Sequence, residues 1–339
     1  MRAFAYFNRA LGSIRILAAP STDPAHTQPG LFARIFLSPE ERRLRAGWRL
    51  LGQSGSMLVI AVTLSITLSL LVAALASIRP DLVSSGVRTE WLLLAISILV
   101  ALFAVTISVW IGRRALDRRA FRSLGLEWGA PAYRDLLIGF LIPLPLFALI
   151  FLAQWRLGWL EIEGWGWSEG NIASTLIGVV LGLAGFLAVG FYEELLFRGY
   201  YLQNLRDGTG LGLALFLSSA VFALAHLGNF SASVASTAGI LAAGYFLAYG
   251  WLRTSSLWLP IGLHIGWNFF QGPVFGFAVS GSTTPSVVVH TVEGPELLTG
   301  GGFGPEAGLI VLPLMALGSA LIWVYTRGRK SVTDQRPAS

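Results

Sequence analysis

Two adjacent carboxylates and a guanidinium lie within one apolar stretch of the chain. Glu193 and Glu194 are followed by Arg198, in a segment that is otherwise uncharged from Ser174 onward. In a helix, side chains four residues apart share a face, so Glu194 and Arg198 can neutralise each other. Glu193 lies about 100° round the helix and stays free to accept a proton. The spacing favours a general base supported by an ion pair, and the alternative is a structural ion-pair cluster at a helix end.

Two histidines and an asparagine lie in later apolar stretches. His226 follows Phe222 by four residues, and His264 and Asn268 are four residues apart in a separate segment. A lone histidine in an apolar helix is more often a hydrogen-bonded core residue than a catalyst. Together with the glutamate pair, however, these groups could hold a water molecule and stabilise an oxyanion. Their combination favours one hydrolytic site.

A metal ion is an open alternative at that site. Glu193, His226 and His264 could bind Zn²⁺ and leave one position for water. The His-Glu-x-x-His pattern of zinc peptidases is absent, and without cysteine there is no thiolate ligand. The sequence favours a water activated by glutamate and histidine without an obligatory metal, and zinc stays the second possibility.

The composition is that of a membrane protein. Of 339 residues, 54% are hydrophobic and only 12% are charged, which excludes an ordinary soluble domain. The formal net charge of +6 comes from arginines clustered between apolar stretches, so it indicates membrane topology and not nucleic-acid binding. We therefore expect an all-α polytopic membrane protein with lipid and peptide as its partners. No feature of the sequence predicts an oligomeric state.

Eight apolar segments are long enough to be expected as membrane-spanning helices of about 20 residues. The fourth to seventh carry the polar groups described above and form the expected catalytic core. The segments are 57–78, 91–112, 136–153, 174–199, 212–229, 234–252, 257–276 and 307–326.

Arginine placement predicts the orientation. Clusters precede the first segment and follow the second and the last, which puts both termini in the cytoplasm. We expect a bacterial plasma-membrane protein with a transmembrane domain over 46–330, flanked by cytoplasmic tails 1–45 and 331–339. The outer loop 277–306 is expected to be irregular, with room for a short hairpin.

A depth argument links two of the segments. With a turn at Asp207–Gly212, Glu193 precedes the turn and His226 follows it by about 14 residues each, or about 21 Å of helix. The two side chains should then face each other, provided that Tyr200–Arg206 stays helical.

The three motifs, Glu-Glu-x-x-x-Arg, Phe-x-x-x-His and His-x-x-x-Asn, occur in this order at about 174–272. In this the chain resembles the type II CAAX prenyl endopeptidase and bacteriocin-processing family, the CPBP or Abi group of intramembrane proteases. The family is commonly described as metalloproteases, which keeps a Zn²⁺ cofactor as an alternative.

The resemblance implies a role for each motif residue. Glu193 would be the base that activates water, and His226 its partner in holding that water or a metal. His264 and Asn268 would stabilise the oxyanion, while Glu194 and Arg198 would support the base. It also implies a CAAX-type or a leader or bacteriocin-like peptide as substrate. The competing hypothesis is a non-catalytic scaffold, immunity protein or transporter that uses the same buried cluster.

Overall fold

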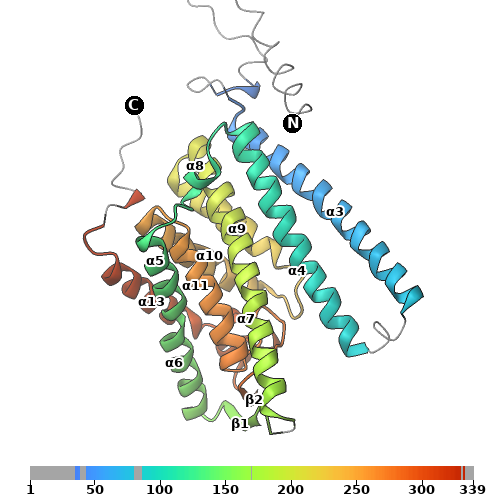
Figure 1. The fold of residues 1–339 in the computed structure, drawn as a ribbon. Helices are drawn as coiled ribbons and strands as arrows, with labels where there is room; N and C mark the ends of the chain where they lie inside the picture. The colour runs from blue at the N-terminus through green and yellow to red at the C-terminus, as the bar shows by residue number, and fades with distance from the viewer. Residues whose placement is uncertain (1–34, 39–42, 80–85, 169, 330, 333–339) are drawn as a thin grey trace, which may run out of the picture. The chain divides into compact units, whose positions relative to one another are not determined.

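The computed structural model describes residues 35–38, 43–79, 86–168, 170–329 and 331–332, with the side chains of 86–91 left aside (Figure 1). The chain divides into two compact units, Met1–Arg42 and Arg43–Ser339. The predicted tail 1–45 lies almost wholly outside the described residues, as does most of 331–339. The fold described below is that of the second unit.

The protein is an all-α polytopic membrane protein. Five helical stretches are long and apolar enough to cross a membrane, and two further apolar helices, Leu211–Ala225 and Val311–Tyr325, are shorter. All eight predicted segments coincide with helices. The five long stretches are Ala46–Ile78, Leu92–Leu116, Ala130–Arg156, Ile172–Thr209 and Val234–Thr254.

Helices α3 (Ala46–Ile78) and α4 (Gly86–Ile111) form an antiparallel pair (Figure 1). A π-helical turn, η3 (Gly112–Leu116), continues α4. The buried residues of α3 all lie in its first two turns, and the rest of the helix presents apolar side chains outward. This pattern fits a helix that faces lipid. Helix α3 begins at Ala46, whereas the predicted segment began at residue 57. The first turns carry the buried Arg49, and a charged residue lowers the hydropathy on which the predicted start was based.

The expected catalytic core is built from four long segments. One of them combines α7 (Ile172–Glu194), a π-helical segment η5 (Leu195–Tyr201) and α8 (Leu202–Thr209) into a continuous helix. The helical condition placed on Tyr200–Arg206 is therefore met. The other three are α9 (Leu211–Ala225), α10 (Val234–Thr254) and α11 (Trp258–Phe269) with its π-helical extension η6 (Phe270–Val274).

The third predicted segment is two helices, α5 (Ala130–Leu141) and α6 (Pro143–Arg156). They separate at Pro143, since proline lacks the N–H that would continue the ladder. Helix α5 packs closely on α11: a Cβ added to Gly262 or Gly266 would collide with the backbone of α5. These small residues, four positions apart on one face of α11, therefore let two backbones meet.

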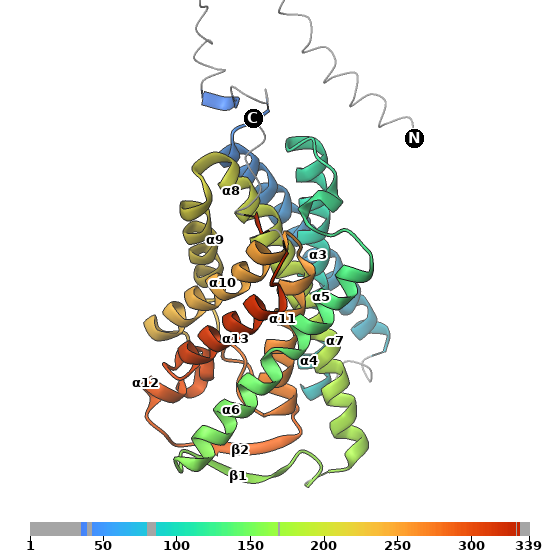
Figure 2. The same cartoon turned by 90° about the vertical axis from the view of Figure 1, so that its left-hand side faces the viewer.

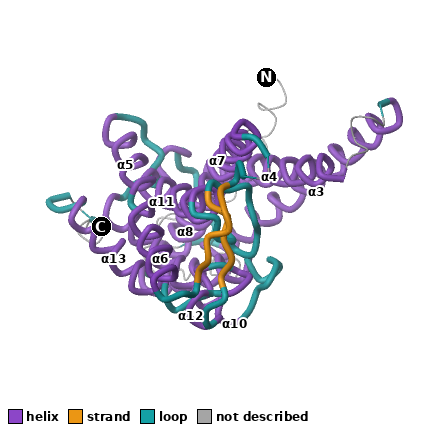
Figure 3. The backbone as a smooth tube through the Cα atoms, turned by 90° about the horizontal axis from the view of Figure 1, so that it is seen from below, coloured by secondary structure: helices purple, strands orange, loops and turns teal. Residues whose placement is uncertain are grey.

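The outer loops join in a small antiparallel sheet. Strand β1 (Leu160–Trp165) pairs with β2 (Val288–Val292), and the pairing is irregular between Ile162 and Gly164. Figure 3 shows the two strands crossing this end of the bundle. The sequence allowed a short hairpin within the loop 277–306. Strand β2 instead pairs with β1, which lies in the preceding outer loop.

Short turns and one helix complete the unit. Helix α13 (Val311–Tyr325) packs beside α10 and α6 (Figure 2). The short elements are η4 (Phe121–Leu124), α12 (Glu296–Thr299), η7 (Gly301–Phe303) and η8 (Pro305–Ala307).

Candidate active site

The glutamate pair lies where α7 changes into a π-helix. Glu194 is the last residue of α7, and the seven-residue η5 begins at the next position. π-Helical turns are rare and frequently occur at functional sites. The predicted ion pair is present: Arg198 Nη1 donates to Glu194 Oε1 at 2.7 Å, and both side chains are almost fully buried.

Arg198 is held by two further contacts. Its Nη2 donates to the carbonyl of Gly244 at 3.1 Å, and its Cζ lies 4.2 Å from the centroid of the Phe222 ring. A guanidinium over an aromatic face is attracted by the ring quadrupole. The charge of Arg198 is therefore compensated on three sides, which fixes η5 against α9 and α10.

His226 stands just past the last residue of α9, and not inside the helix as predicted. Its Nδ1 lies 2.8 Å from the carbonyl of Phe222. Because a carbonyl can only accept, Nδ1 carries the proton and Nε2 is left for the site. That Nε2 is 4.0 Å from Glu193 Oε2, which agrees with the depth argument made from the sequence.

His264 contacts both glutamates. Its Nδ1 donates to Glu194 Oε1 at 2.9 Å, and its Nε2 is 3.8 Å from Glu193 Oε2. Glu194 therefore orients this imidazole as well as pairing with Arg198. The three segments that carry the motifs thus converge on the carboxylate of Glu193.

The site has more acceptors than donors. With both imidazoles neutral, their Nε2 atoms and Glu193 Oε2 are all acceptors, and Oε2 is buried without a hydrogen-bond partner in the protein. A buried polar atom without a partner costs about 1–3 kcal/mol. One water between these atoms can donate two hydrogen bonds, and a protonated His264 supplies a third donor. The arrangement therefore suits a bound and polarised water.

The same atoms can be compared with the ligands of a zinc site. Tetrahedral Zn²⁺ with bonds of about 2.0–2.1 Å holds neighbouring donor atoms about 3.4 Å apart. Here the carboxylate oxygen and the imidazole nitrogens are 3.8 and 4.0 Å apart. Across the residues that the structure describes, no group of His, Asp or Glu side chains is disposed to hold a metal ion. These atoms stand wider apart than the ligands of an assembled zinc site, so zinc binding would require the side chains to close around the ion.

A cavity of about 820 Å³ opens onto Glu193, His226, His264 and Asn268. Its walls come from α4, α7, α9, α10, α11 and the outer loop from Val279 to Pro285. Asn268 is only 6% exposed, yet it lines this space and can point a carboxamide donor into it. Glu194 and Arg198 are not part of the lining, so they act behind the wall.

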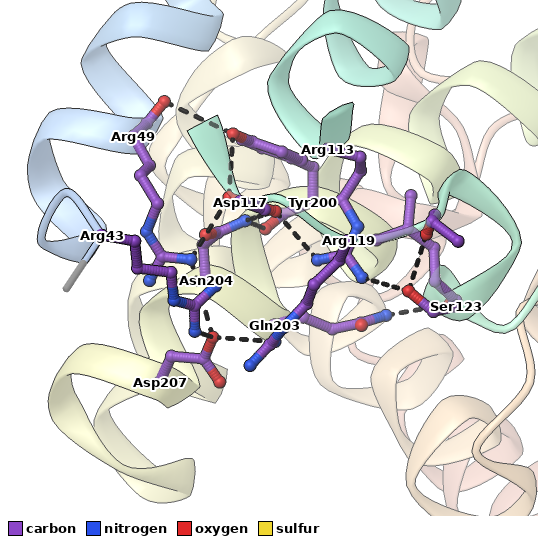
Figure 4. A network of polar contacts seen from close by, with 12 residues as sticks. Arg43, Arg49, Arg113, Asp117, Arg119, Ser123, Tyr200, Gln203, Asn204 and Asp207 are labelled. Atoms are coloured by element: carbon purple, nitrogen blue, oxygen red, sulfur yellow. Dashed lines mark hydrogen bonds and ion pairs between the residues drawn. The ribbon is translucent and has the colours of Figure 1, made fainter. Parts of the chain in front are cut away.

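A second buried charge cluster lies at the end of the bundle where α3 begins and α8 ends. Figure 4 shows Arg49 of α3 and Arg113 of η3 turned toward Asp117, at 3.2 and 2.8 Å. Tyr200, at the end of η5, also contacts this carboxylate, at 3.4 Å. The cluster therefore ties α3 and α4 to the helix that carries the glutamate pair. In the sequence these arginines indicate only membrane topology, and no motif there marks Asp117 or Tyr200.

A carboxylate of the outer loop also lies at the site without a motif that predicts it. Glu306, only 3% exposed, lines the cavity and accepts hydrogen bonds from Trp267 Nε1 at 3.1 Å and from the backbone N–H of Ser280 at 2.7 Å. A single charge in a loop rich in glycine carries no signal of burial, so only the fold reveals it.

Comparison with known proteins supports the family resemblance. Residues 175–270 match a family model described as Rce1-like, type II CAAX prenyl endopeptidase Rce1-like. This stretch contains all three motifs, and the match confirms the resemblance drawn from them. No curated protein and no solved structure matches the chain.

Proposed function

We propose that this integral membrane protein, whose residues 175–270 form a core similar to type II CAAX endopeptidases, is an intramembrane peptidase with Glu193 as its general base. The observation that carries the proposal is the convergence of two imidazole Nε2 atoms on the unpaired Glu193 Oε2, at 3.8 and 4.0 Å, in the wall of a large cavity. A peptide bond inside a helix bundle can be hydrolysed only if water is held at that depth. These atoms provide hydrogen-bond acceptors that can hold such a water.

The reaction is ordinary amide hydrolysis. A water held between Glu193 and His226 attacks the peptide carbonyl, and Glu193 takes its proton. Asn268 donates to the oxyanion, and His264 adds a second donor when it takes up a proton, its charge then being offset by the Glu194 carboxylate at Nδ1. When the C–N bond breaks, Glu193 returns the proton to the leaving amine. The products are a new carboxylate and a new amine, with no covalent enzyme intermediate and no obligatory metal.

Glu194 and Arg198 are positioning residues in this scheme. Their hydrogen bond of 2.7 Å lies behind the cavity wall, and Glu194 also holds His264 at 2.9 Å. The pair thus fixes the direction of one imidazole and the turn of helix that presents Glu193. Removing either partner would leave the other charge buried without its counter-charge.

The substrate is a membrane-associated peptide, either of the CAAX type or a leader or bacteriocin-like peptide. The mostly apolar wall from α4 and α7, with residues such as Ile98, Leu181 and Val189, suits a hydrophobic segment. We place the protein in a bacterial plasma membrane with both termini in the cytoplasm, since arginines gather at the end of the bundle shown in Figure 4.

A comparison of membrane peptides tests the proposal. Cells that carry the wild type, Glu193→Gln or no protein are compared by mass spectrometry. Glu161→Gln, on the exposed face of β1, is the matched control. We expect one or more uncut peptides in the Glu193→Gln and empty cells only. Identical peptides in all four strains would overturn the peptidase and favour the non-catalytic scaffold.

A further inference from the structure

His226 lies outside the regular part of its helix. It follows the last residue of α9, and its φ of −94° and ψ of 0° are those of a turn and not of a helix. The chain continues in turns, with the backbone N–H of Asn229 donating to the carbonyl of His226 at 3.1 Å. A hydrogen-bond ladder fixes the side chains of a helix, whereas a side chain on a run of turns depends on other contacts for its position. The segment after α9 therefore needs support from elsewhere if His226 Nε2 is to stay 4.0 Å from Glu193 Oε2.

The turn Val279–Ser282 of the outer loop gives that support. The side chain of Asn229 donates to the carbonyl of Ser280 at 3.0 Å. At the next position, a Cβ added to Gly281 would collide with the carbonyl of Phe230, so the two backbones meet directly. Gly281 has a φ of +84°, which a residue without a Cβ adopts readily. The turn is closed by two hydrogen bonds between its end residues, at 2.8 and 2.9 Å, and is therefore a rigid point of attachment.

Glu306 ties this turn to α11. Its Oε2 accepts from the backbone N–H and the hydroxyl of Ser280, at 2.7 and 2.8 Å, and its Oε1 accepts from Trp267 Nε1 at 3.1 Å. Trp267 lies about one turn after His264 in α11. Glu306 and Trp267 are only 3% and 5% exposed. A continuous bridge therefore joins α11 to the segment after α9, through Trp267, Glu306, Ser280 and Asn229.

We propose that Asn229 and Glu306 are positioning residues, which use this bridge to hold the imidazole of His226 at the site. The inference rests on the proposed function and names residues outside the three motifs that its site requires. Helix α11 carries His264, so the bridge sets the distance between the two imidazoles that flank Glu193, independently of Glu193 itself. A displacement of about 1 Å at a reacting group can lower a rate about 10²-fold. Neither positioning residue needs to touch the substrate for its loss to slow the reaction.

The first test compares Asn229→Ala with Ser286→Ala in the full-length protein in lipid vesicles. Ser286 lies in the same outer loop and also donates to a carbonyl, that of Val288 at 2.8 Å, but it is not part of the bridge. The substrate is the best-cleaved member of a synthetic mixture of randomised short peptides, identified by mass spectrometry. We expect kcat to fall about 10-fold to 10²-fold in Asn229→Ala, with KM within about twofold of the wild type. Ser286→Ala should keep both values.

The second test observes His226 directly and needs no substrate. Nuclear magnetic resonance of protein with ¹⁵N-labelled histidine reports which ring nitrogen carries the proton. The chain has four histidines, so each signal can be assigned from the variant that lacks it. In the wild type we expect His226 in the single tautomer that donates from Nδ1 to the carbonyl of Phe222. In Asn229→Ala its signals should shift toward the average of the two tautomers, while those of His290 stay in place.

Glu306→Gln tests the other end of the bridge. The amide keeps the length of the side chain, but it has one acceptor oxygen in place of two and brings a donor against Trp267 or Ser280. We expect the same fall in kcat and the same shift of the His226 signals. Because Asn229 and Glu306 act through one bridge, the double variant should lose no more than the larger single loss. Losses that multiply would show two independent effects and overturn the bridge.

The inference stands only if kcat falls and the His226 signals shift in the same variants. Unchanged signals, an unchanged kcat or a loss confined to KM would overturn it, and the last would make Asn229 a substrate contact. If the wild type cuts peptides and these variants behave as Ser286→Ala does, only this inference falls. If the wild type cuts none, the proposed function falls, and the signals of His226 still decide whether the bridge holds this imidazole.

Discussion

The buried carboxylates at the two ends of η5 differ in how well they are satisfied. At the arginine-rich end, Asp117 accepts four hydrogen bonds, from two arginines, a tyrosine and an asparagine, and its side chain is fully buried. At the other end, Glu193 Oε2 has no partner in the protein and faces two further acceptors. The first arrangement holds helices together, and the second is unfavourable until a water or a proton is added.

This difference distinguishes a carboxylate that stabilises the fold from a carboxylate that takes part in the reaction. The side chain of Asp117 is 0% exposed and that of Glu193 is only 16% exposed, so the clearer difference is in how many hydrogen-bond donors meet each carboxylate. Altering the fully hydrogen-bonded carboxylate of Asp117 should destabilise the fold, and altering the carboxylate of Glu193, which has a free oxygen, should abolish activity.

The largest effect is expected on stability, from a substitution of Asp117. Asp117→Asn leaves the buried Arg113 without its counter-charge and Arg49 with only Asp207, at 3.6 Å, which should lower the free energy of unfolding by about 3–5 kcal/mol. Unfolding in mixed detergent micelles measures it. Asp207→Asn is the matched control: its carboxylate pairs with Arg43 at 2.7 Å but is 24% exposed, so its loss should be smaller. Equal losses of unfolding free energy in the two variants would show that Asp117 contributes no more to stability than the partly exposed Asp207.

The second effect is on activity. His226→Ala removes one of the groups that hold the water, and peptide cleavage should fall about 10³-fold while the unfolding midpoint changes little. His290→Ala is the control, since this imidazole packs between Phe151 and Phe277 of the outer region. Burial lowers the pKa of His290, so it stays neutral near pH 7 and carries no charge to the site. A His226→Ala protein as active as His290→Ala would contradict the scheme.

A smaller effect is expected from the oxyanion donor. Asn268→Ala should lower kcat about 10²-fold with little change in KM, because the hydrogen bond forms only as charge develops on the carbonyl oxygen. Asn171→Ala, which removes the side-chain cap of α7 at Ser174, serves for comparison. That variant should lose about 1 kcal/mol of stability and keep its kcat. A loss expressed in KM alone would make Asn268 a binding residue.

The smallest effect is expected from metal removal. If the site holds water and not zinc, treatment with a chelator should leave the cleavage rate unchanged, and metal analysis should find less than one ion per chain. The separations of 3.8 and 4.0 Å are the reason for this expectation. Activity that is lost on chelation and restored by Zn²⁺ would show that the side chains close around a metal.

Much of this molecule could be predicted from local patterns. Hydropathy located the helices, the four-residue spacing of Glu194 and Arg198 predicted their ion pair, and the turn at 207–212 placed Glu193 opposite His226. Each of these rests on helix geometry, which sequence spacing specifies directly. The same geometry did not show the π-helical turn after Glu194, since it depends on how η5 packs.

The contacts between distant segments could not be predicted. The partner of β2 lies in another loop, Asp117 meets an arginine from α3 across 68 positions, and Glu306 reaches Ser280 and Trp267 only through the fold. Such pairings depend on tertiary packing, and a lone acidic residue in a loop gives no period by which to recognise it.

The most direct test of the central claim measures the activity and the stability of Glu193→Gln together, on purified protein in lipid vesicles. The amide nearly preserves the shape of the side chain, removes the base and adds a donor to a place that has too many acceptors. We predict a loss of cleavage of about 10³-fold or more, with an unfolding midpoint equal to or above that of the wild type. Retained cleavage, or a midpoint that falls as it does for Asp117→Asn, would contradict the assignment of Glu193 as the general base.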